Sequence, residues 1–403
     1  MRIIYFSPHP THDIVSDVGY STHQREMIAA LREIGHEVIP VIIGGAEASE
    51  VPAHATTEGN KVLGWIKVLL PGILWRTFKD FKLIWHDRNH SGPRLKRAIE
   101  KHTPDLIYER SEYLLGQGTK ISKVAGVPHI LEVNAPCVEE WIEFEGASLL
   151  TGFAHRVERK KLQRATGLCP VSSPLAHYIR DEYFLDEHRI QFVPNAINPK
   201  SVSEALHADQ TLRGRLDIQP SEIVIGFIGS ILEYHGVDIL VEAFHIVQKE
   251  VSNVRLLVVG DGALLKMLRS RTEELGMANK VQFTDRVPHN EVYDYMSVMD
   301  ICVNPAHSWY GSPIKTFEYG ALAKPIIAPD SANMRDVLEH EKTAWLAKTD
   351  VESLAKAITQ LCLNKKDASL MGEAFKEQVM TDHTWISNAR RLEKFAQQLT
   401  ENK

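Results

Sequence analysis

The chain has 403 residues, of which 44% are hydrophobic and 24% are charged, and its formal net charge is −6. This length exceeds what one hydrophobic core usually organises, so we expect two domains of ordinary globular composition. The acidic balance leaves no basic surplus for holding a polyanion, which argues against a nucleic-acid-binding protein.

Short apolar runs separated by helical patterns fill the first half of the chain. The runs cover residues 3–6, 38–43, 106–108, 129–133 and 168–171, and helical patterns include 24–34 and 93–101. This alternation predicts βαβ units and a mainly parallel sheet. Because the sequence reads as a strand directly from Met1, no secretory signal is expected. Residues 44–92 interrupt the rhythm, and we expect an irregular excursion there.

The most apolar part of this excursion, 62–75, contains Lys67 and Pro71 and is too short to span a membrane. Packing on its own domain is the interpretation we favour, and lying on a membrane surface is the alternative. The alternative rests on apolar side chains next to basic ones, namely Trp65, Leu69, Leu70, Trp75 and Phe78 beside Lys67, Arg76 and Lys79.

The alternation restarts more regularly in the second half. Strands are predicted at 223–228, 256–259, 281–283, 301–303 and 325–328, which gives a sheet of at least five strands. Between them, Val237 begins an apolar stripe that recurs at 3, 4, 7 and 10 positions, as on one face of a helix. A proline-containing segment, 193–199, separates the halves. We therefore place the domains at 1–198 and 199–384 and expect a last helix, about 385–403, to pack back on the first domain.

The segment 311–320, with the sequence GSPIKTFEYG, is the most informative about a binding site. It follows a predicted strand, and Pro313 suits the first turn of a helix. The free N–H groups and dipole of such a helix favour a bound diphosphate. Lys315 would add positive charge, and Glu318, further along the helix, would accept hydrogen bonds from ribose hydroxyls. A plain capped helix with surface Lys and Glu is the alternative, and composition does not separate the two.

Glycines also follow the first two strands of the second half. Gly229 would let a ligand approach the backbone, and Ser230 and His235 would donate hydrogen bonds to it; the alternative is a tight turn with a solvent-facing histidine. Gly260 and Gly262 form a common G-x-G pattern, and the absence of a complete G-x-G-x-x-G leaves a dinucleotide site without its fingerprint.

Polar residues also mark the edges of the first predicted sheet. Polar groups at the carboxyl ends of parallel strands tend to be functional, since ligands bind there in open α/β folds. The candidates before the first helix and after the third and fourth strands are Gly19, Tyr20, Thr22, Glu109, Arg110, Glu132 and Asn134.

We expect no metal and no cofactor. The sequence has no Asp-x-Asp motif and no His, Cys and carboxylate cluster with metal-ligand spacing. Without a metal ion, Lys315 and the helix amides would have to stabilise the negative charge of a ligand at the helix N-terminus. The four cysteines form no C-x-x-C and are expected as buried thiols in a reducing cytosol.

Taken in order, these segments resemble glycosyltransferase family 4 of the GT-B superfamily over nearly the whole chain, and in particular a branch with S-P-x-K-x-F-E-Y and E-V-N-A-P motifs. Each motif is weak alone, and the ordered set is specific. The matching segments are Gly35–Val38, Val193–Asn195, Gly236–Phe244, Gly260–Gly262, Asn304–Pro305, Glu318–Ala321 and Lys324–Pro325.

The resemblance implies an α/β fold of two Rossmann-like, doubly wound domains facing a central cleft, with the acceptor bound by the first and the donor by the second. It implies transfer of a sugar from a nucleoside diphosphate sugar, UDP favoured, with retention of configuration. Glu318 matches the family's ribose-binding second glutamate, and the base would stack near Arg286 and Val287. The diphosphate-binding turn matches Ser312, Pro313, Ile314 and Lys315.

The sequence also departs from the family pattern. Tyr310 stands in place of the first glutamate, Ser230 and His235 replace the usual Arg and Lys, and Asn134 stands where many members carry a catalytic-site histidine. We therefore expect Lys315, Asn134, Ser230 and His235 to be the catalytic side chains. The acceptor side of the cleft is assigned to Gly19, Tyr20, Thr22, Glu109, Arg110, Glu132 and Tyr310.

Two other functions stay open at this point. A nucleotide-sugar epimerase or hydrolase of the same fold would need acid/base groups such as Glu109 and Glu132. A non-catalytic sugar-nucleotide-binding subunit would explain the departures at Tyr310, Ser230 and His235. The expected partners are the donor and a small-molecule, glycan or lipid-linked acceptor, with no nucleic acid. We expect a cytoplasmic protein, with the inner face of the membrane as an alternative location.

Overall fold

The computed structural model describes residues 1–16, 18–45, 71–205, 211–288 and 291–401. The chain forms two compact units, Met1–Pro194 with Trp385–Lys403, and Asn195–Thr384. The division falls after Pro194, four residues before the boundary that the sequence suggests and within the same proline-containing segment. None of the helices among the described residues has both the length and the apolar character that crossing a membrane requires.

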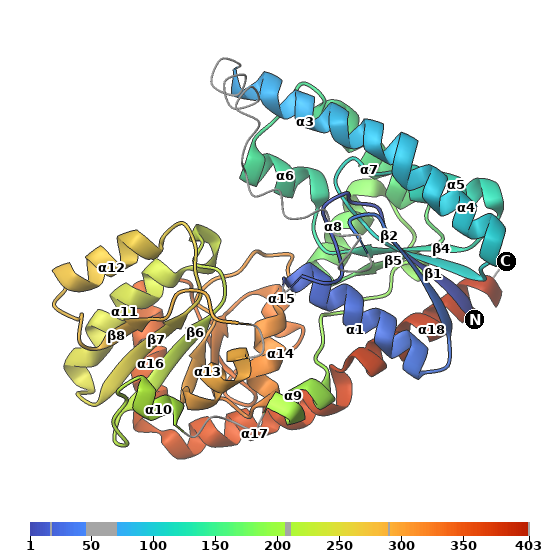
Figure 1. The fold of residues 1–403 in the computed structure, drawn as a ribbon. Coiled ribbons are helices and arrows are strands. Elements are labelled where there is room, and N and C mark those ends of the chain that lie inside the picture. Colours follow the sequence, from blue (N-terminus) through green and yellow to red (C-terminus); the bar gives the residue numbers. More distant parts are fainter. Residues whose placement is uncertain (17, 46–70, 206–210, 289–290, 402–403) are drawn as a thin grey trace. The chain divides into compact units, whose positions relative to one another are not determined.

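The first unit contains a sheet of five parallel strands in the order β2-β1-β3-β4-β5 (Figure 1). Since β1 pairs with both β2 and β3, the winding direction reverses between β1 and β3. The strands are β1 (Arg2–Ser7), β2 (Glu37–Ile42), β3 (Leu106–Arg110), β4 (His129–Val133) and β5 (Gly167–Pro170).

Helices flank this sheet, and one of them corrects an expectation. The stretch 72–91, expected to be irregular, is helical throughout, while Trp65, Lys67, Leu69 and Leu70 lie outside the described residues. The helices are α1 (Gly19–Glu33), α3 (Gly72–His86), the π-helix η1 (Asp87–Ser91), α4 (Gly92–His102), α5 (Gln117–Ala125), α6 (Cys137–Glu145), α7 (Thr151–Arg164), α8 (Ser173–Tyr183), the short η2 (Glu187–Arg189) and α18 (Trp385–Glu401).

The last of these helices, α18, completes the first unit. Its Trp385 ring contacts His23 of α1 at 4.7 Å between centroids, and its Asn388 donates to the carbonyl of Pro194 at 2.6 Å. Further along, Phe395 and Leu399 pack so closely on Gly167 of β5 that a Cβ there would lie 2.5–2.9 Å from their side chains.

The second unit contains six parallel strands in the order β11-β10-β9-β6-β7-β8. Counted along the unit, this is the 3-2-1-4-5-6 order of the doubly wound dinucleotide-binding fold, which reverses between β6 and β9. The strands are β6 (Ile223–Ile228), β7 (Val254–Val259), β8 (Val281–Phe283), β9 (Ile301–Val303), β10 (Ile326–Pro329) and β11 (Trp345–Ala347).

Two helical layers cover this second sheet, as Figure 1 shows. Alternate residues of β6 belong to different cores: Phe227 packs with α11, α12 and α16, and Ile228 packs with α13, α14 and α17. Burying each large apolar side chain contributes about 1.5–3 kcal/mol, so both faces are needed to hold the sheet. The helices are α9 (Pro199–Ala205), α10 (Leu212–Arg215), η3 (Glu233–His235), α11 (Val237–Glu250), α12 (Leu265–Glu274), α13 (Val292–Val298), α14 (Ile314–Ala321), α15 (Ala332–Arg335), α16 (Val351–Leu363) and α17 (Lys365–Asp382).

Candidate functional site

The carboxyl ends of β6 and β9 define the switch point of the second sheet, where open α/β folds bind ligands. The N-terminus of α14 is fixed beside this point. The Tyr319 hydroxyl accepts a hydrogen bond from the Ile228 amide at 2.9 Å, which ties α14 to the end of β6. The Asn195 amide donates to the Ser312 hydroxyl at 3.0 Å, and the Asn195 side chain donates to the Ser312 carbonyl. The turn that precedes α14 is therefore held in place before any ligand arrives.

Lys315 presents a buried ammonium group at this switch point. Its Nζ lies 4.3 Å from the centre of the Phe227 ring, and no acceptor within the described residues forms a hydrogen bond with it. Burial lowers the pKa of Lys315 to about 8, although the nearby Glu318 carboxylate opposes the shift. A buried charge without hydrogen-bond partners is costly, and a bound anion would remove that cost.

Gly229 makes room for this ammonium. Its φ is +137°, and a Cβ at this position would lie 2.8 Å from Lys315 Nζ. Any larger residue would be strained in its backbone and would displace the lysine. Glycine at the end of β6 is thus explained by the position of Lys315.

Glu318 lies on the same helix with a pKa raised to about 7 by burial, which the Lys315 charge and a hydrogen bond from Tyr293 oppose. Lys315 and Glu318 are therefore a base and an acid in one buried environment, and the charge of each stabilises the ionised form of the other. In its ionised form Glu318 can accept the two hydrogen bonds that a ribose diol offers.

His235 does not fit its expected role as a hydrogen-bond donor to a phosphate. Its Nδ1 lies 2.6 Å from the Ser230 carbonyl oxygen, which only accepts, so Nδ1 carries the proton. Burial and the Lys315 charge lower the pKa of His235 to about 4, so the ring is neutral and Nε2 is an acceptor. His235 can accept from a sugar hydroxyl, whereas the exposed Ser230 hydroxyl remains a candidate donor.

Two residues after β9 also belong to this site, and sequence reasoning did not assign them. Asn304 is 1% exposed and neither atom of its amide has a partner in the described part of the chain; the same holds for Nδ1 of His307. The His307 ring lies parallel to the His235 ring with centroids 6.5 Å apart, and burial with the Lys315 and His235 charges lowers its pKa to about 3. The Asn-Pro dipeptide after a strand is only a weak sequence signal for a site residue at Asn304. No sequence pattern marks His307 as one.

Gly260 and Gly262 have a packing role. A Cβ on Gly260, whose φ is +137°, would lie 2.0 Å from the Gly229 carbonyl oxygen, and one on Gly262 would lie 2.3 Å from the Ile231 carbonyl oxygen. The loops after β6 and β7 therefore touch through their backbones.

In the expected base-binding region, Arg286 is exposed and Val287 packs partly against the core.

The loop before α14 carries Tyr310, the residue in the position of the family's first glutamate. Tyr310 is buried and meets the exposed Trp309 ring edge-to-face, with centroids 5.4 Å apart. The Asn333 side chain holds this loop by donating to the carbonyls of Ser308 and Gly311, each at 2.9 Å. Tyr310 is thus an anchored aromatic residue and offers no carboxylate.

In the first unit, Glu132 is the centre of a charged network at the end of β4. It accepts hydrogen bonds from Arg110 at 2.7 Å, from His23 at 2.9 Å and from the Asn134 amide at 2.6 Å. Burial raises its pKa, but the His23 and Arg110 charges outweigh this and bring it to about 2. A carboxylate with this pKa and three donors is a poor general base.

A second part of this network lies at the switch point between β1 and β3, and sequence reasoning missed it. Glu112 contacts His12 Nδ1 at 3.0 Å and Arg110 Nε at 3.2 Å. The ring of His12 stacks between those of His9 and Tyr20, at centroid distances of 4.0 and 4.2 Å. Tyr20 therefore lies at this edge of the sheet, as the sequence suggested. Its stacking on His12 is not predicted by any pattern in the neighbouring sequence.

The remaining first-unit candidates differ in environment. Glu109 is fully buried, lies 2.7 Å from His129 Nε2, and is covered by Gly118 of α5, where a Cβ would be 1.7 Å from its Oε2. This corrects the assignment of Glu109 to the cleft, because its side chain stabilises the interior. Thr22 accepts from Arg25 at 3.2 Å, and Gly19 has open space beyond its Cα.

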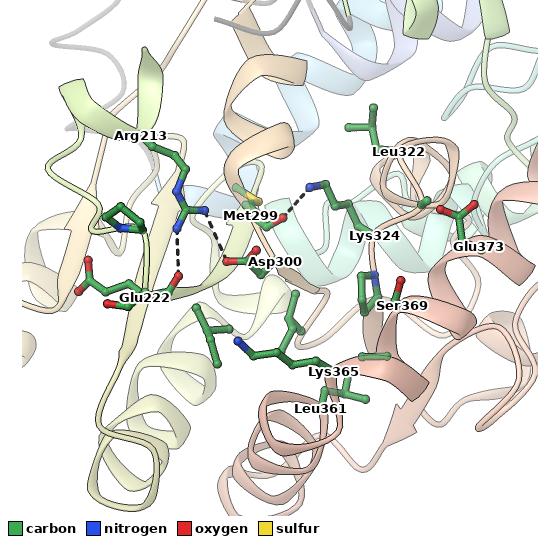
Figure 2. Close-up of a pocket in the computed structure, with 17 residues that line it drawn as sticks. Arg213, Glu222, Met299, Asp300, Leu322, Lys324, Leu361, Lys365, Ser369 and Glu373 are labelled. Carbon is green, nitrogen blue, oxygen red and sulfur yellow. Dashed lines mark hydrogen bonds and ion pairs between the residues drawn. The ribbon is translucent and has the colours of Figure 1, made fainter. Parts of the chain in front are cut away.

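Two other features are explained by the fold. A cavity of about 500 Å³ lies at the amino ends of β6, β9 and β10, opposite to the switch-point edge (Figure 2), where Arg213 pairs with Asp300 at 3.6 Å and Lys324 donates to the Met299 carbonyl at 2.7 Å. Two of its three cations, Arg213 and Lys324, are thus already held by partners within the described residues. In the first unit, Glu139, His155 and Glu158 lie close enough to hold an ion, but Glu158 already accepts from the Cys137 amide and the Tyr183 hydroxyl.

Comparison with known proteins agrees with this architecture. The family model "Glycosyl transferases group 1" matches residues 208–378, and the model "Glycosyl transferase 4-like domain" matches residues 18–196. A GDP-mannose-dependent alpha-(1-6)-phosphatidylinositol monomannoside mannosyltransferase from Mycobacterium tuberculosis is 23% identical over 314 residues, covering 75% of this chain and 78% of that protein.

Two solved structures are similar in fold. Sucrose-phosphate synthase from Thermosynechococcus elongatus aligns over 100% of both chains with a TM-score of 0.74 and 19% identity. HepE from Anabaena, solved in complex with UDP, aligns over 98% of this chain and 99% of that chain, with a TM-score of 0.72 and 14% identity.

Proposed function

We propose, from the premise that the chain belongs to the family 4-like glycosyltransferases of GT-B fold, that it moves a hexosyl or N-acetylhexosaminyl group from a nucleoside diphosphate sugar to an acceptor hydroxyl. The observation that carries the donor assignment is the buried ammonium of Lys315, unpartnered among the described residues, beside the N-terminus of α14. A diphosphate supplies the missing acceptors, and the free amides of α14 add to its binding.

The proposed reaction retains the anomeric configuration by displacement on one face of the sugar. The acceptor oxygen forms a bond to the anomeric carbon while the bond from that carbon to the diphosphate oxygen breaks. The acceptor proton passes to the departing phosphate oxygen, so no protein carboxylate is required. This agrees with Tyr310 in place of a glutamate and with the low pKa of Glu132. Lys315 would stabilise the charge that develops on the leaving diphosphate.

We propose UDP as the donor nucleotide, as the commonest donor of this class of enzyme. The Anabaena HepE structure contains UDP, whereas the Mycobacterium relative is named for GDP-mannose, so the base is the first point to measure. The proposed acceptor is a small molecule, a glycan or a lipid-linked acceptor. A non-catalytic subunit would bind the donor equally well, and turnover with an acceptor separates the two.

Calorimetry of UDP, GDP and ADP binding to the wild type and to Glu318→Ala tests the site. We expect one nucleotide to bind clearly better than the others and the substitution to weaken it by about 2 kcal/mol, or roughly thirtyfold, since charged hydrogen bonds to the ribose are lost. Glu377→Ala, on the exposed face of α17, is the control and should bind like the wild type. Absence of binding by all three nucleotides would overturn the proposal.

Nucleotide affinity should also depend on pH in a bell-shaped manner, with its maximum between about 7 and 8. Below this range Glu318, whose pKa is about 7, becomes protonated and accepts less well from ribose. Above it Lys315, whose pKa is about 8, loses the proton that attracts the diphosphate. Because the diphosphate raises the pKa of Lys315, binding near pH 8 should take up protons, which calorimetry in buffers of different ionisation enthalpy measures. Proton release at this pH would contradict the assignment.

A further inference from the structure

The helix α3 has its polarity reversed with respect to its own unit. The side chains that it buries most deeply are Thr77 and Asp80. Asp80 accepts hydrogen bonds from Ser148 at 2.5 Å and from Tyr113 at 3.1 Å, and Thr77 accepts from the Leu149 amide at 3.0 Å. A helix on the surface of a globular protein normally turns its polar side chains to water and its apolar ones inward.

The outward face of α3 is apolar and continues onto the neighbouring helix. Leu149 is held against Thr77, and Phe153 of α7 lines a common cavity with Ile84 of α3. We define the α3 patch as six large side chains that are 41–64% exposed, namely Leu74, Phe78, Phe81, Trp85, Leu149 and Phe153. The four that belong to α3 recur at spacings of 4, 3 and 4, which places them in one stripe along the helix.

Within residues 71–98, which form α3, η1 and the start of α4, the exposed charges are of one sign. Between residues 71 and 98 the only acidic residues are Asp80 and Asp87, and both are buried. The exposed Glu145 of the neighbouring helix α6 is paired with Lys79 at 2.7 Å. The basic residues of this stretch are Arg76, Lys79, Lys82, Arg88, Arg94, Lys96 and Arg97. A protein of net charge −6 thus concentrates basic residues along the consecutive helices α3, η1 and α4.

A basic pocket of about 390 Å³ lies at the end of the patch, between η1, α5 and α7. Its acidic lining residue, Asp87, is occupied by hydrogen bonds from the amides of Gly116 and Gln117 at 2.9 and 3.1 Å. The exposed basic residues of its lining are Arg88, Lys120, Lys160 and Arg164. Apolar contact and a site for phosphate oxygens therefore lie side by side.

We infer that the α3 patch docks the first unit on the surface of an anionic phospholipid membrane. The aromatic and aliphatic side chains would enter the boundary between headgroups and acyl chains, and the basic residues would contact the lipid phosphates. A second copy of this chain, bound patch to patch, fits less well, because a two-fold interface would bring the same basic residues together. This inference concerns binding to lipid and does not depend on the identity of the donor.

Sedimentation with lipid vesicles tests the inference without any enzymatic assay. We expect the wild type to bind vesicles that contain phosphatidylglycerol and phosphatidylcholine in equal parts, and to bind phosphatidylcholine vesicles far more weakly. The double variant Phe81→Ser/Trp85→Ser should bind the anionic vesicles about tenfold to a hundredfold less tightly, because two large apolar side chains are lost. The variant Lys82→Glu/Arg88→Glu should lose most of the preference for anionic lipid.

Matched controls keep the outcome interpretable. Met267→Ser/Leu370→Ser removes two side chains of the second unit that are 47% and 59% exposed, and should bind vesicles like the wild type. Circular dichroism and thermal unfolding of every variant verify the fold, and nucleotide calorimetry shows separately whether the proposed function fails. The inference is overturned if the wild type does not bind vesicles, or if the Phe81 and Trp85 variant binds as well as the wild type. It is also overturned if these substitutions instead dissociate a dimer that binds no lipid.

Discussion

Lys315→Met is expected to lower kcat by about a hundredfold, or roughly 3 kcal/mol, with a smaller change in KM for the donor. The charge on the diphosphate grows as the bond to the sugar breaks, so an ammonium at this position stabilises the transition state more than the bound donor. Methionine retains most of the side-chain volume over Phe227 and removes only the charge. Steady-state kinetics with saturating acceptor measure both constants.

Two further variants serve as comparisons for Lys315→Met: Lys315→Ala, and a substitution of an exposed lysine. Lys315→Ala should lose a similar amount of kcat, which shows that charge and not packing is responsible. Lys348→Met changes an exposed lysine of the same unit and should leave kcat unchanged. If Lys315→Met raised only KM, Lys315 would be a binding residue that does not act in the transition state. An unchanged kcat and KM would remove Lys315 from the site.

Glu132→Gln is expected to destabilise the first unit by about 3–5 kcal/mol, because the largely buried Arg110 guanidinium loses the counter-charge that lies 2.7 Å from it. Urea denaturation and amide hydrogen exchange in β3 and β4 measure this effect. The surface substitution Glu100→Gln, which breaks only an exposed pair with Lys96 at 3.8 Å, should cost less than about 1 kcal/mol. Equal stability of both variants would show that the Glu132 network does not hold this edge together.

The pH dependence of this difference has a defined sign. The native pKa of Glu132 is depressed to about 2 from 4.5, so its contribution is fully present above pH 4.5 and disappears as the pH falls toward 2. The wild type and Glu132→Gln should therefore converge in stability over that range.

Incubation of the donor without acceptor adds a functional test of Glu132. An epimerase or hydrolase that uses Glu132 as a base would convert the donor, and Glu132→Gln would stop that conversion.

The regular parts of the fold were predictable because their signal is local. Each predicted apolar run in both halves corresponds to a strand between β1 and β10, and the stripe from Val237 corresponds to α11. The edge strand β11 was not predicted, although β8 and β9 are equally short and were. Helix α3 was missed for a different reason, since it buries Thr77 and Asp80 and the usual relation between polarity and burial is inverted.

The candidate site was predictable only where one segment carries it. Lys315 and Glu318 share a single turn-and-helix motif, so the sequence alone was enough to propose them together. His307 and Glu112 are brought to their sites by strand order, and nothing adjacent to them in the chain indicates it. The protonation of His235 likewise depends on the carbonyl of Ser230 and the charge of Lys315, which a sequence pattern does not specify.

The return of α18 to the first unit affects how the protein is made. The ribosome finishes residues 1–194 long before it reaches Trp385, so the surface around Gly167 and His23 stays uncovered while the second unit is synthesised. The second unit is continuous in sequence and can complete its core first. The half of the chain that is translated first is therefore the half whose packing is completed last, when Phe395 and Leu399 reach Gly167.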